Sequence, residues 1–234
     1  RDYYASRGLG DVYKRQDQNS TTIYLREGKY VLDKPLMLTS DDGNDSKELI
    51  IKNYPGEKTV LSSGIVLDLK WEKYKNGIMR AVVKGSPVMD MLFVNGELKS
   101  MARYPNYDEK AVRFNGTSAL ATAPERVKKW KCPEGGYLHA MHKHDWGDFH
   151  YRITGKNEKG ELQLEGGWQN NRPMGIHNEN RMVENIFEEL DAPGEWYYDK
   201  QEGWLYYYPL PDEKINELTF ETCLLYTSDA ADEL

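Results

Sequence analysis

The stretch TTIYLREGKYVLDKPLML, residues 21–38, decides the fold class of this chain. Its apolar side chains alternate in pairs that share one face of an extended segment: Ile23 and Leu25, Tyr30 and Leu32, and Leu36 and Leu38. Gly28 and Pro35 separate these pairs. Alternation with a period of two, interrupted by turn residues, predicts three short strands rather than a helix.

The sequence on the C-terminal side of this stretch continues the β pattern. Residues 40–47 are a polar loop, and short apolar runs follow at 49–51 and 60–61. Very short strands separated by turns favour stacked coils over long hairpins. From residue 66 the segments become longer and richer in aromatic residues. Strands are predicted at 77–83, 91–94, 137–150, 151–154, 162–164, 195–199 and 204–208.

Two local signals are sharper than the rest. Asn95-Gly96, between Val94 and Leu98, predicts a tight β-hairpin. Residues 182–190 are the best helix candidate, with Asn180 as a cap and the sequence Asp-Ala-Pro-Gly at 191–194 as a stop. The prediction is therefore an all-β chain with one short helix.

The composition excludes several classes of protein. The chain has 234 residues and a formal charge of −7, with 39% hydrophobic and 12% aromatic residues. This acidity argues against a nucleic-acid or anionic-membrane partner, which would need a basic face. No apolar run reaches the ~18 residues of a transmembrane helix, and the aromatic content argues against disorder.

The two ends of the chain resemble translated sequencing adaptor. Residues 11–16, DVYKRQ, can be encoded by GATGTGTATAAGAGACAG, and the reverse complement of that sequence, read one base further in, encodes CLLYTS, residues 223–228. A library insert flanked by an inverted repeat explains such a relation, whereas two ends of a natural protein do not. We therefore expect residues 1–16 and 223–234 to be artefact.

Several stretches carry a resemblance to a known class of carbohydrate-active enzymes. IYLREGKY (23–30) and the runs at 49–52 and 60–64 resemble the first coils of right-handed parallel β-helix, pectin-lyase-like proteins. The middle of the chain is similar to the β-rich insertion domain of glycoside hydrolase family 141. The matching stretches are FVNG (93–96), ARYPN (102–106), GGWQNNR (166–172), VENIFEELDAPGEWY (183–197) and WLYYYP (204–209).

This resemblance implies a domain organisation. It places the start of a parallel β-helix at 17–65, an inserted sandwich-like or barrel-like β domain at 66–210, and a return to the β-helix at 211–222. The implied protein is an extracytoplasmic glycoside hydrolase (periplasmic, cell-surface or secreted) that binds a polysaccharide or oligosaccharide and needs no cofactor. In such families the catalytic carboxylates lie on later coils, so we expect a metagenome-like, inactive fragment whose catalytic residues lie beyond residue 222.

Two alternatives stay open because fold analogy does not fix a reaction. A polysaccharide lyase of the β-helix class would need a basic residue, and often calcium, to remove the proton beside a uronate. A non-catalytic carbohydrate-binding surface protein would need no paired carboxylates. The sequence contains no phosphate-binding glycine loop, no nucleophile-elbow pattern and no HExxH motif.

Glycosidases need two carboxyl groups beside the scissile bond, so acidic clusters are the first candidates. The cluster is Glu184, Glu188, Glu189 and Asp191, and on a helix Glu184 and Glu188 would share a face. A solvated acidic face is the simpler interpretation of this group. Glu184 and Asn185 are nevertheless candidate substrate contacts.

Histidine, aromatic and arginine residues supply the remaining candidates. His139, His142, His144 and His150 lie close in sequence, and on a strand His142 and His144 would face the same side, but their spacing matches no standard zinc pattern. We predict hydrogen-bonded or groove-lining histidines, with His139 and His142 as substrate contacts and no metal. Among Trp146, Trp168, Trp196 and Trp204, Trp168 is the best candidate for an exposed sugar platform, since glycines and asparagines flank it. Arg103 and Arg172 are candidates to bind sugar hydroxyls or a uronate carboxylate.

Overall fold

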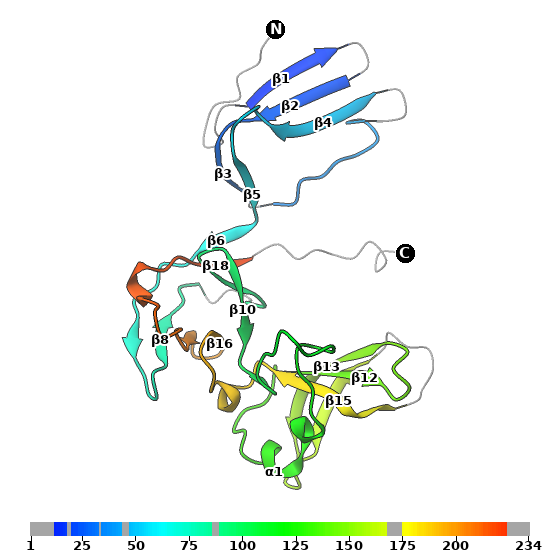
Figure 1. Ribbon diagram of the computed structural model, residues 1–234, viewed down its shortest axis with the longest axis vertical. Coiled ribbons are helices and arrows are strands. Elements are labelled where there is room, and N and C mark those ends of the chain that lie inside the picture. Colours follow the sequence, from blue (N-terminus) through cyan, green and yellow to red (C-terminus); the bar gives the residue numbers. More distant parts are fainter. Residues whose placement is uncertain are drawn as a thin grey trace. The chain divides into compact units, whose positions relative to one another are not determined.

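The computed structural model describes residues 12–17, 20–32, 34–43, 47–85, 89–167 and 175–223 (Figure 1). The chain divides into two compact units, an N-terminal unit of residues 1–65 with 223–234 and a central unit of residues 66–222. Strand β6 (Gly64–Val66) lies at the boundary between them.

The N-terminal unit is built from short strands that pair mainly in parallel. Its strands are β1 (Val12–Asp17), β2 (Ser20–Leu25), β3 (Gly28–Val31), β4 (Glu48–Asn53) and β5 (Thr59–Ser62). β2 pairs with β4 in parallel, and β3 pairs with β5 in parallel, whereas β1 pairs with β2 antiparallel. Along the chain, β2 and β3 are therefore followed by β4 and β5. β4 adds to the sheet that contains β2, and β5 adds to the sheet that contains β3.

Side chains reinforce this parallel stacking. Arg26, just after β2, donates through Nε and Nη2 to the Glu57 carboxylate, which precedes β5, and Glu57 also accepts from the Glu27 backbone N–H. The Thr59 hydroxyl donates to the carbonyl of Arg26. Both interactions join the turn between β2 and β3 to the turn between β4 and β5.

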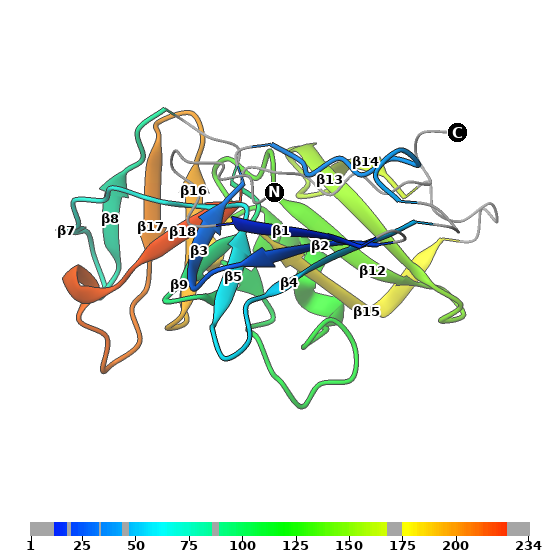
Figure 2. The same ribbon diagram turned by 90° about the horizontal axis from the view of Figure 1, so that it is seen from above.

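The central unit contains two sheets. The first has the order β18-β9-β10-β16-β17-β8-β7, and the second, five-stranded, has the order β11-β15-β12-β13-β14 (Figure 2). The strands of the first sheet are β7 (Glu72–Lys73), β8 (Met79–Val82), β9 (Leu92–Val94), β10 (Glu97–Met101), β16 (Glu195–Asp199), β17 (Trp204–Tyr207) and β18 (Phe220–Cys223). Those of the second are β11 (Arg103–Tyr104), β12 (Tyr137–His142), β13 (Asp148–Lys156), β14 (Leu162–Gly166) and β15 (Ile176–Glu184).

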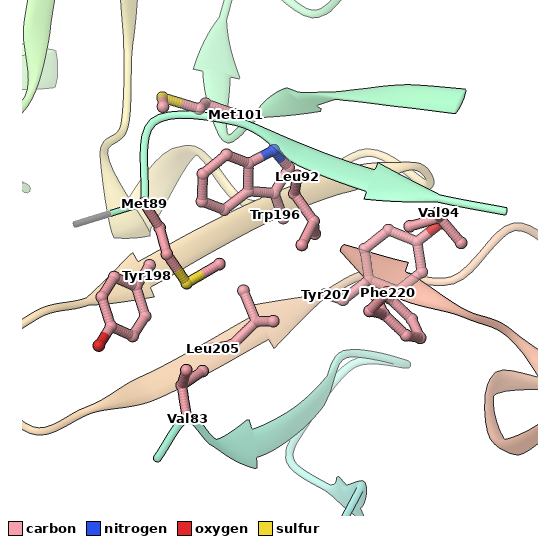
Figure 3. Packing of buried hydrophobic residues seen from close by; sticks show 10 residues of the cluster. All are labelled: Val83, Met89, Leu92, Val94, Met101, Trp196, Tyr198, Leu205, Tyr207 and Phe220. Carbon is pink, nitrogen blue, oxygen red and sulfur yellow. The ribbon is translucent and has the colours of Figure 1, made fainter. Parts of the chain in front are cut away.

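The first sheet of the central unit packs an aromatic core. Trp196 and Tyr207 are fully buried, and Figure 3 shows Met101, Leu205 and Phe220 gathered around them. The Trp196 indole N–H donates to the Lys99 carbonyl at 3.0 Å, so its burial leaves no polar group unpaired. The side chains at every second position of β16 and β17 therefore face this core: Trp196, Tyr198, Leu205 and Tyr207.

The second sheet is covered on one face by short helices. Val127 and Trp130 of the segment around η1 (Ala119–Thr122) and α1 (Pro124–Val127) pack against Leu138, Ile153 and Val183. Because these residues take every second position of β12, β13 and β15, the other face of the sheet carries Tyr137, His139 and Glu184. That second face borders the candidate site described below.

The structure confirms the all-β prediction and corrects the position of the helix. The predicted helix at 182–190 is wrong. Residues 182–184 are the end of β15, and the helical structure within 182–190 is limited to one 3₁₀ turn, η2 (Phe187–Glu189). The apolar spacing there resembled a helical stripe, but backbone pairing of β15 with β11 and β12 overrides it. Asn185, with φ of 57°, turns the chain between the two elements.

The hairpin prediction holds. β9 and β10 pair antiparallel around Asn95-Gly96, whose positive φ angles of 50° and 82° suit a type I′ turn. β16 and β17, which match the strands predicted at 195–199 and 204–208, form a second hairpin around residues 200–203. A further 3₁₀ turn, η3 (Ile215–Glu217), precedes β18.

Candidate functional site: a polar groove in the central unit

A groove of about 720 Å³ lies where the two sheets of the central unit meet. It is lined by β10, β11 and the end of β15, by the start of β16, and by the loops around residues 90, 106 and 192. The lining residues are Asp90, Met91, Leu98, Lys99, Ser100, Met101, Arg103, Asn106, Tyr107, Glu184, Ala192, Pro193, Gly194, Glu195 and Leu210. Two of the predicted site residues, Arg103 and Glu184, are therefore in one groove.

Arg103 holds a wall of this groove in place. Its side chain is 5% exposed, and its guanidinium donates to the carbonyl oxygens of Pro105 at 2.8 Å, Phe114 at 2.6 Å and Gly116 at 3.1 Å. Burial lowers the pKa of the guanidinium, while the carboxylate of Glu184 opposes that shift. Arg103 therefore orders the loop at 105–116. Its guanidinium supports the wall of the groove and is not free to bind a sugar.

Glu195 is a buried acid in the wall of the groove. It begins β16, is 2% exposed, and accepts the backbone N–H of Ala192 at 3.3 Å through Oε2. Oε1 has no hydrogen-bond partner among the residues that the structure describes. Desolvation raises the pKa of this carboxyl to about 8, so the group is protonated at neutral pH. The sequence pattern did not single out Glu195, although it begins the strand that contains the buried Trp196.

Glu184 lies between the groove and a histidine. It sits directly across from Arg103 in the β11–β15 pairing, and its Oε1 is 2.8 Å from Nε2 of His139. Glu184 and His139 are part-buried, with side chains 25% and 17% exposed. The structure therefore joins His139 to Glu184 and so to the edge of the groove.

The other predicted contacts lie elsewhere. His142 is fully buried, accepts the backbone N–H of His144 through Nδ1, and stacks on Trp146 with ring centroids 5.4 Å apart. Asn185 donates through Nδ2 to the carbonyl of Gly135 at 2.9 Å and does not line the groove. Neither side chain is placed to contact a ligand there. Trp168 and Arg172 lie outside the described residues.

Three members of the acidic cluster, Glu188, Glu189 and Asp191, form hydrogen bonds that stabilise the fold. Glu189 is 4% exposed and accepts from Trp130 Nε1 at 2.7 Å and from Arg126 Nη1 at 2.6 Å. Glu188 accepts the backbone N–H of Lys131, and Asp191 accepts from Asn106 at 3.1 Å. A solvated acidic face is thus wrong for Glu189, because a buried carboxylate with two strong donors is a packing element.

The exposed fraction of each aromatic side chain distinguishes core residues from possible sugar contacts. Trp196 belongs to the core, whereas Trp146 is 62% exposed at the turn between β12 and β13. Tyr107, 55% exposed, is the aromatic side chain that lines the groove. The sequence reasoning did not select Tyr107, and its only local signal is the proline-asparagine turn that precedes it.

Comparisons with known proteins give one structural match. A solved structure described as a glycoside hydrolase superposes with a TM-score of 0.66 at 22% sequence identity, covering 90% of this chain and 39% of that one. The chain therefore shares the fold of part of a glycoside hydrolase and spans well under half of its length. No family model matches the sequence, and no curated protein matches it.

Two features are absent from the described ranges. No helix there is long and apolar enough to cross a membrane. No group of three or more His, Cys, Asp or Glu side chains is arranged there to hold a metal ion.

Proposed function

We propose that this chain is part of a carbohydrate-active protein of the glycoside hydrolase class, and that the groove of the central unit contacts a saccharide. The observation that carries the proposal is the fold similarity to a glycoside hydrolase over 90% of the chain. The groove supplies chemical support of its own through the groups that line it. We also propose that the protein acts outside the cytoplasm, as its resemblance to extracytoplasmic glycoside hydrolases implies.

The chemistry of the groove suits a sugar. Carbohydrates present many hydroxyl groups and flat apolar ring faces, and sites that bind them combine convergent polar groups with an aromatic surface. Here Lys99, Asn106 and Glu184 supply charged and amide groups, and Tyr107 supplies an exposed ring. The protonated Glu195 adds a neutral acid beneath them.

For the N-terminal unit we propose the first coils of a right-handed parallel β-helix, as in family 141. Ser20 of β2 lies beside Glu48 of β4 in parallel register, and Gly28 of β3 lies beside Thr59 of β5. Consecutive strands thus enter two parallel sheets in turn, as stacked coils require. Large apolar side chains stay exposed in this unit, and further coils would cover them: Val31, Leu36, Met37, Leu38, Val60 and Leu61.

We further propose that the catalytic carboxylates lie on coils that this chain does not include. The similar glycoside hydrolase extends far beyond the matched region, and 39% of it is covered. Glu189 is buried and accepts hydrogen bonds from Trp130 and Arg126, so it is not free to act on a bond. Incubation with aryl glycosides and plant polysaccharides should give no turnover; hydrolysis by this chain alone would contradict the proposal, and an unsaturated uronate product would indicate a lyase.

Binding by the groove can be tested with the chain itself. Glycan-array or calorimetric binding should be lost in Tyr107→Ala, because the exposed ring offers the stacking surface of the groove. Trp146→Ala removes an equally exposed ring outside the groove and serves as the matched control. Loss of binding in Trp146→Ala with retention in Tyr107→Ala would place the sugar site on the β12–β13 turn instead.

A further inference from the structure

The charged residues that line the groove differ in how far they reach its surface. Its two cationic residues are largely buried, since the side chain of Lys99 is 11% exposed and Arg103 is 5% exposed. The acidic residues Asp90 and Glu184 are only part-buried, and the Glu184 side chain is 25% exposed. The charge that a ligand meets at the surface of the groove is therefore mainly negative.

Both cations are also held by other groups of the protein. Nζ of Lys99 lies 3.2 Å from a carboxylate oxygen of Glu97 and 3.8 Å from one of Glu213. The guanidinium of Arg103 donates to four carbonyl oxygens of the loop at 105–116. A uronate in the groove would therefore lose hydration beside like charges and would gain no free cationic partner.

Glu195 adds a second acidic group beneath the same surface. The parallel register of β10 and β16 pairs Glu195 with Ser100, and both residues line the groove. Successive side chains of a strand point to opposite faces, so Glu195 faces away from the core that contains Trp196 in Figure 3. Glu195 is 2% exposed, and its Oε1 atom has no hydrogen-bond partner among the described residues. Leaving such an oxygen unpaired is costly, and a donor on a ligand would relieve that cost.

We propose that the groove selects its saccharide by charge: it favours a glycan that carries free amino groups and disfavours one that carries carboxylates. This inference rests on the proposed saccharide-binding role of the groove. A protonated amino group has three hydrogen-bond donors and no acceptor, so it complements the carboxylate of Glu184 and the unpaired oxygen of Glu195. Desolvation raises the pKa of Glu195 to about 8, and a positive charge beside this carboxyl would favour its ionised form.

The experiment compares glycans that share a backbone and differ in charge. The probes are oligomers of glucose and of galactose, each in its neutral, amino and uronate form, and they are titrated into the full chain at about pH 6, where an amino group is protonated. The amino form should bind about three- to tenfold more tightly than the neutral form, and the uronate form should bind more weakly than both. These differences should shrink between about 0.05 M and about 0.5 M NaCl, because salt screens charges near the surface.

Two variants assign the preference to the acidic residues of the groove. Glu184→Gln and Glu195→Gln should each lower the ratio of amino-form to neutral-form affinity by about twofold or more. Glu179→Gln removes an exposed charge of β15 outside the groove and should leave this ratio unchanged. Thermal unfolding checks that each variant is folded, and the salt dependence of the wild type tests the proposal without any substitution.

The outcomes separate this inference from the proposed function. Uronate forms that bind as tightly as amino forms would overturn selection by charge while leaving a saccharide-binding groove. A preference for amino forms that neither Glu184→Gln nor Glu195→Gln alters would overturn it as well. Failure of every form to bind would contradict the saccharide-binding role on which the inference rests.

Discussion

Glu195 couples the stability of the central unit to pH. Burial raises its pKa in the folded protein to about 8, against 4.5 for an ordinary glutamate. Between these values the unfolded chain releases a proton that the folded protein keeps. The free energy of unfolding therefore falls as the pH rises from about 5 to about 8, by at most about 1.4 kcal/mol per pH unit from this group.

Glu195→Gln should remove this dependence, because glutamine imitates the neutral acid in shape and carries no proton to release. Urea unfolding at about pH 5 and about pH 8 measures it, and the variant should gain on the wild type at the higher pH. Glu179→Gln, at an exposed position of β15, should follow the wild type at both values. A constant difference between Glu195→Gln and wild type across this range would contradict a buried, protonated acid.

Arg103 supports the loop at 105–116 through four carbonyl oxygens. Arg103→Lys keeps the charge but loses the planar fork of donors, so buried carbonyls lose their partners. We expect the free energy of unfolding to fall by about 2–4 kcal/mol, and amide exchange in the loop to accelerate. Arg152→Lys, at an exposed position of β13, should change stability by less than about 0.5 kcal/mol.

At the scale of elements, Asn185 directly follows β15. Its φ of 57° turns the chain toward η2, and its side-chain amide donates to the carbonyl of Gly135. Asn185→Ala should lower the free energy of unfolding by about 1–3 kcal/mol, since alanine disfavours this backbone conformation and removes the hydrogen bond. Asn185→Gly keeps the conformation and loses only the hydrogen bond, so chemical denaturation should rank it between wild type and Asn185→Ala. Equal losses would show that the backbone conformation costs nothing.

Elements whose signals are local could be predicted from the sequence. Asn95-Gly96 specifies a hairpin because both positions need positive φ, and the alternation at residues 195–207 specifies paired strands. β15 could not be predicted so, since the spacing of Met182, Ile186 and Leu190 fits a helical stripe. Its strand conformation depends on pairing with β11 and β12, which lie far away in sequence.

The same distinction applies to the candidate site. Arg103 and Glu184 were selected as polar residues within recognisable stretches, and the structure brings both into one groove. Glu195 and Tyr107 were not selected, because their significance comes from burial and exposure rather than from residue type. His142 was selected for its type, and its burial removes it from contact with a ligand.

At the scale of the whole molecule, the central unit contains every element of its own core. The three buried clusters, centred on Trp196, Trp130 and Tyr206, draw all their members from residues 66–222. A segment with its own hydrophobic core is expected to fold without its neighbours. Residues 66–222 expressed alone should therefore unfold cooperatively in urea and retain the tryptophan fluorescence of the full chain. Trp130→Ala in this segment should lower the free energy of unfolding by about 3–5 kcal/mol, whereas a non-cooperative transition in the unaltered segment would mean that the core depends on residues outside 66–222.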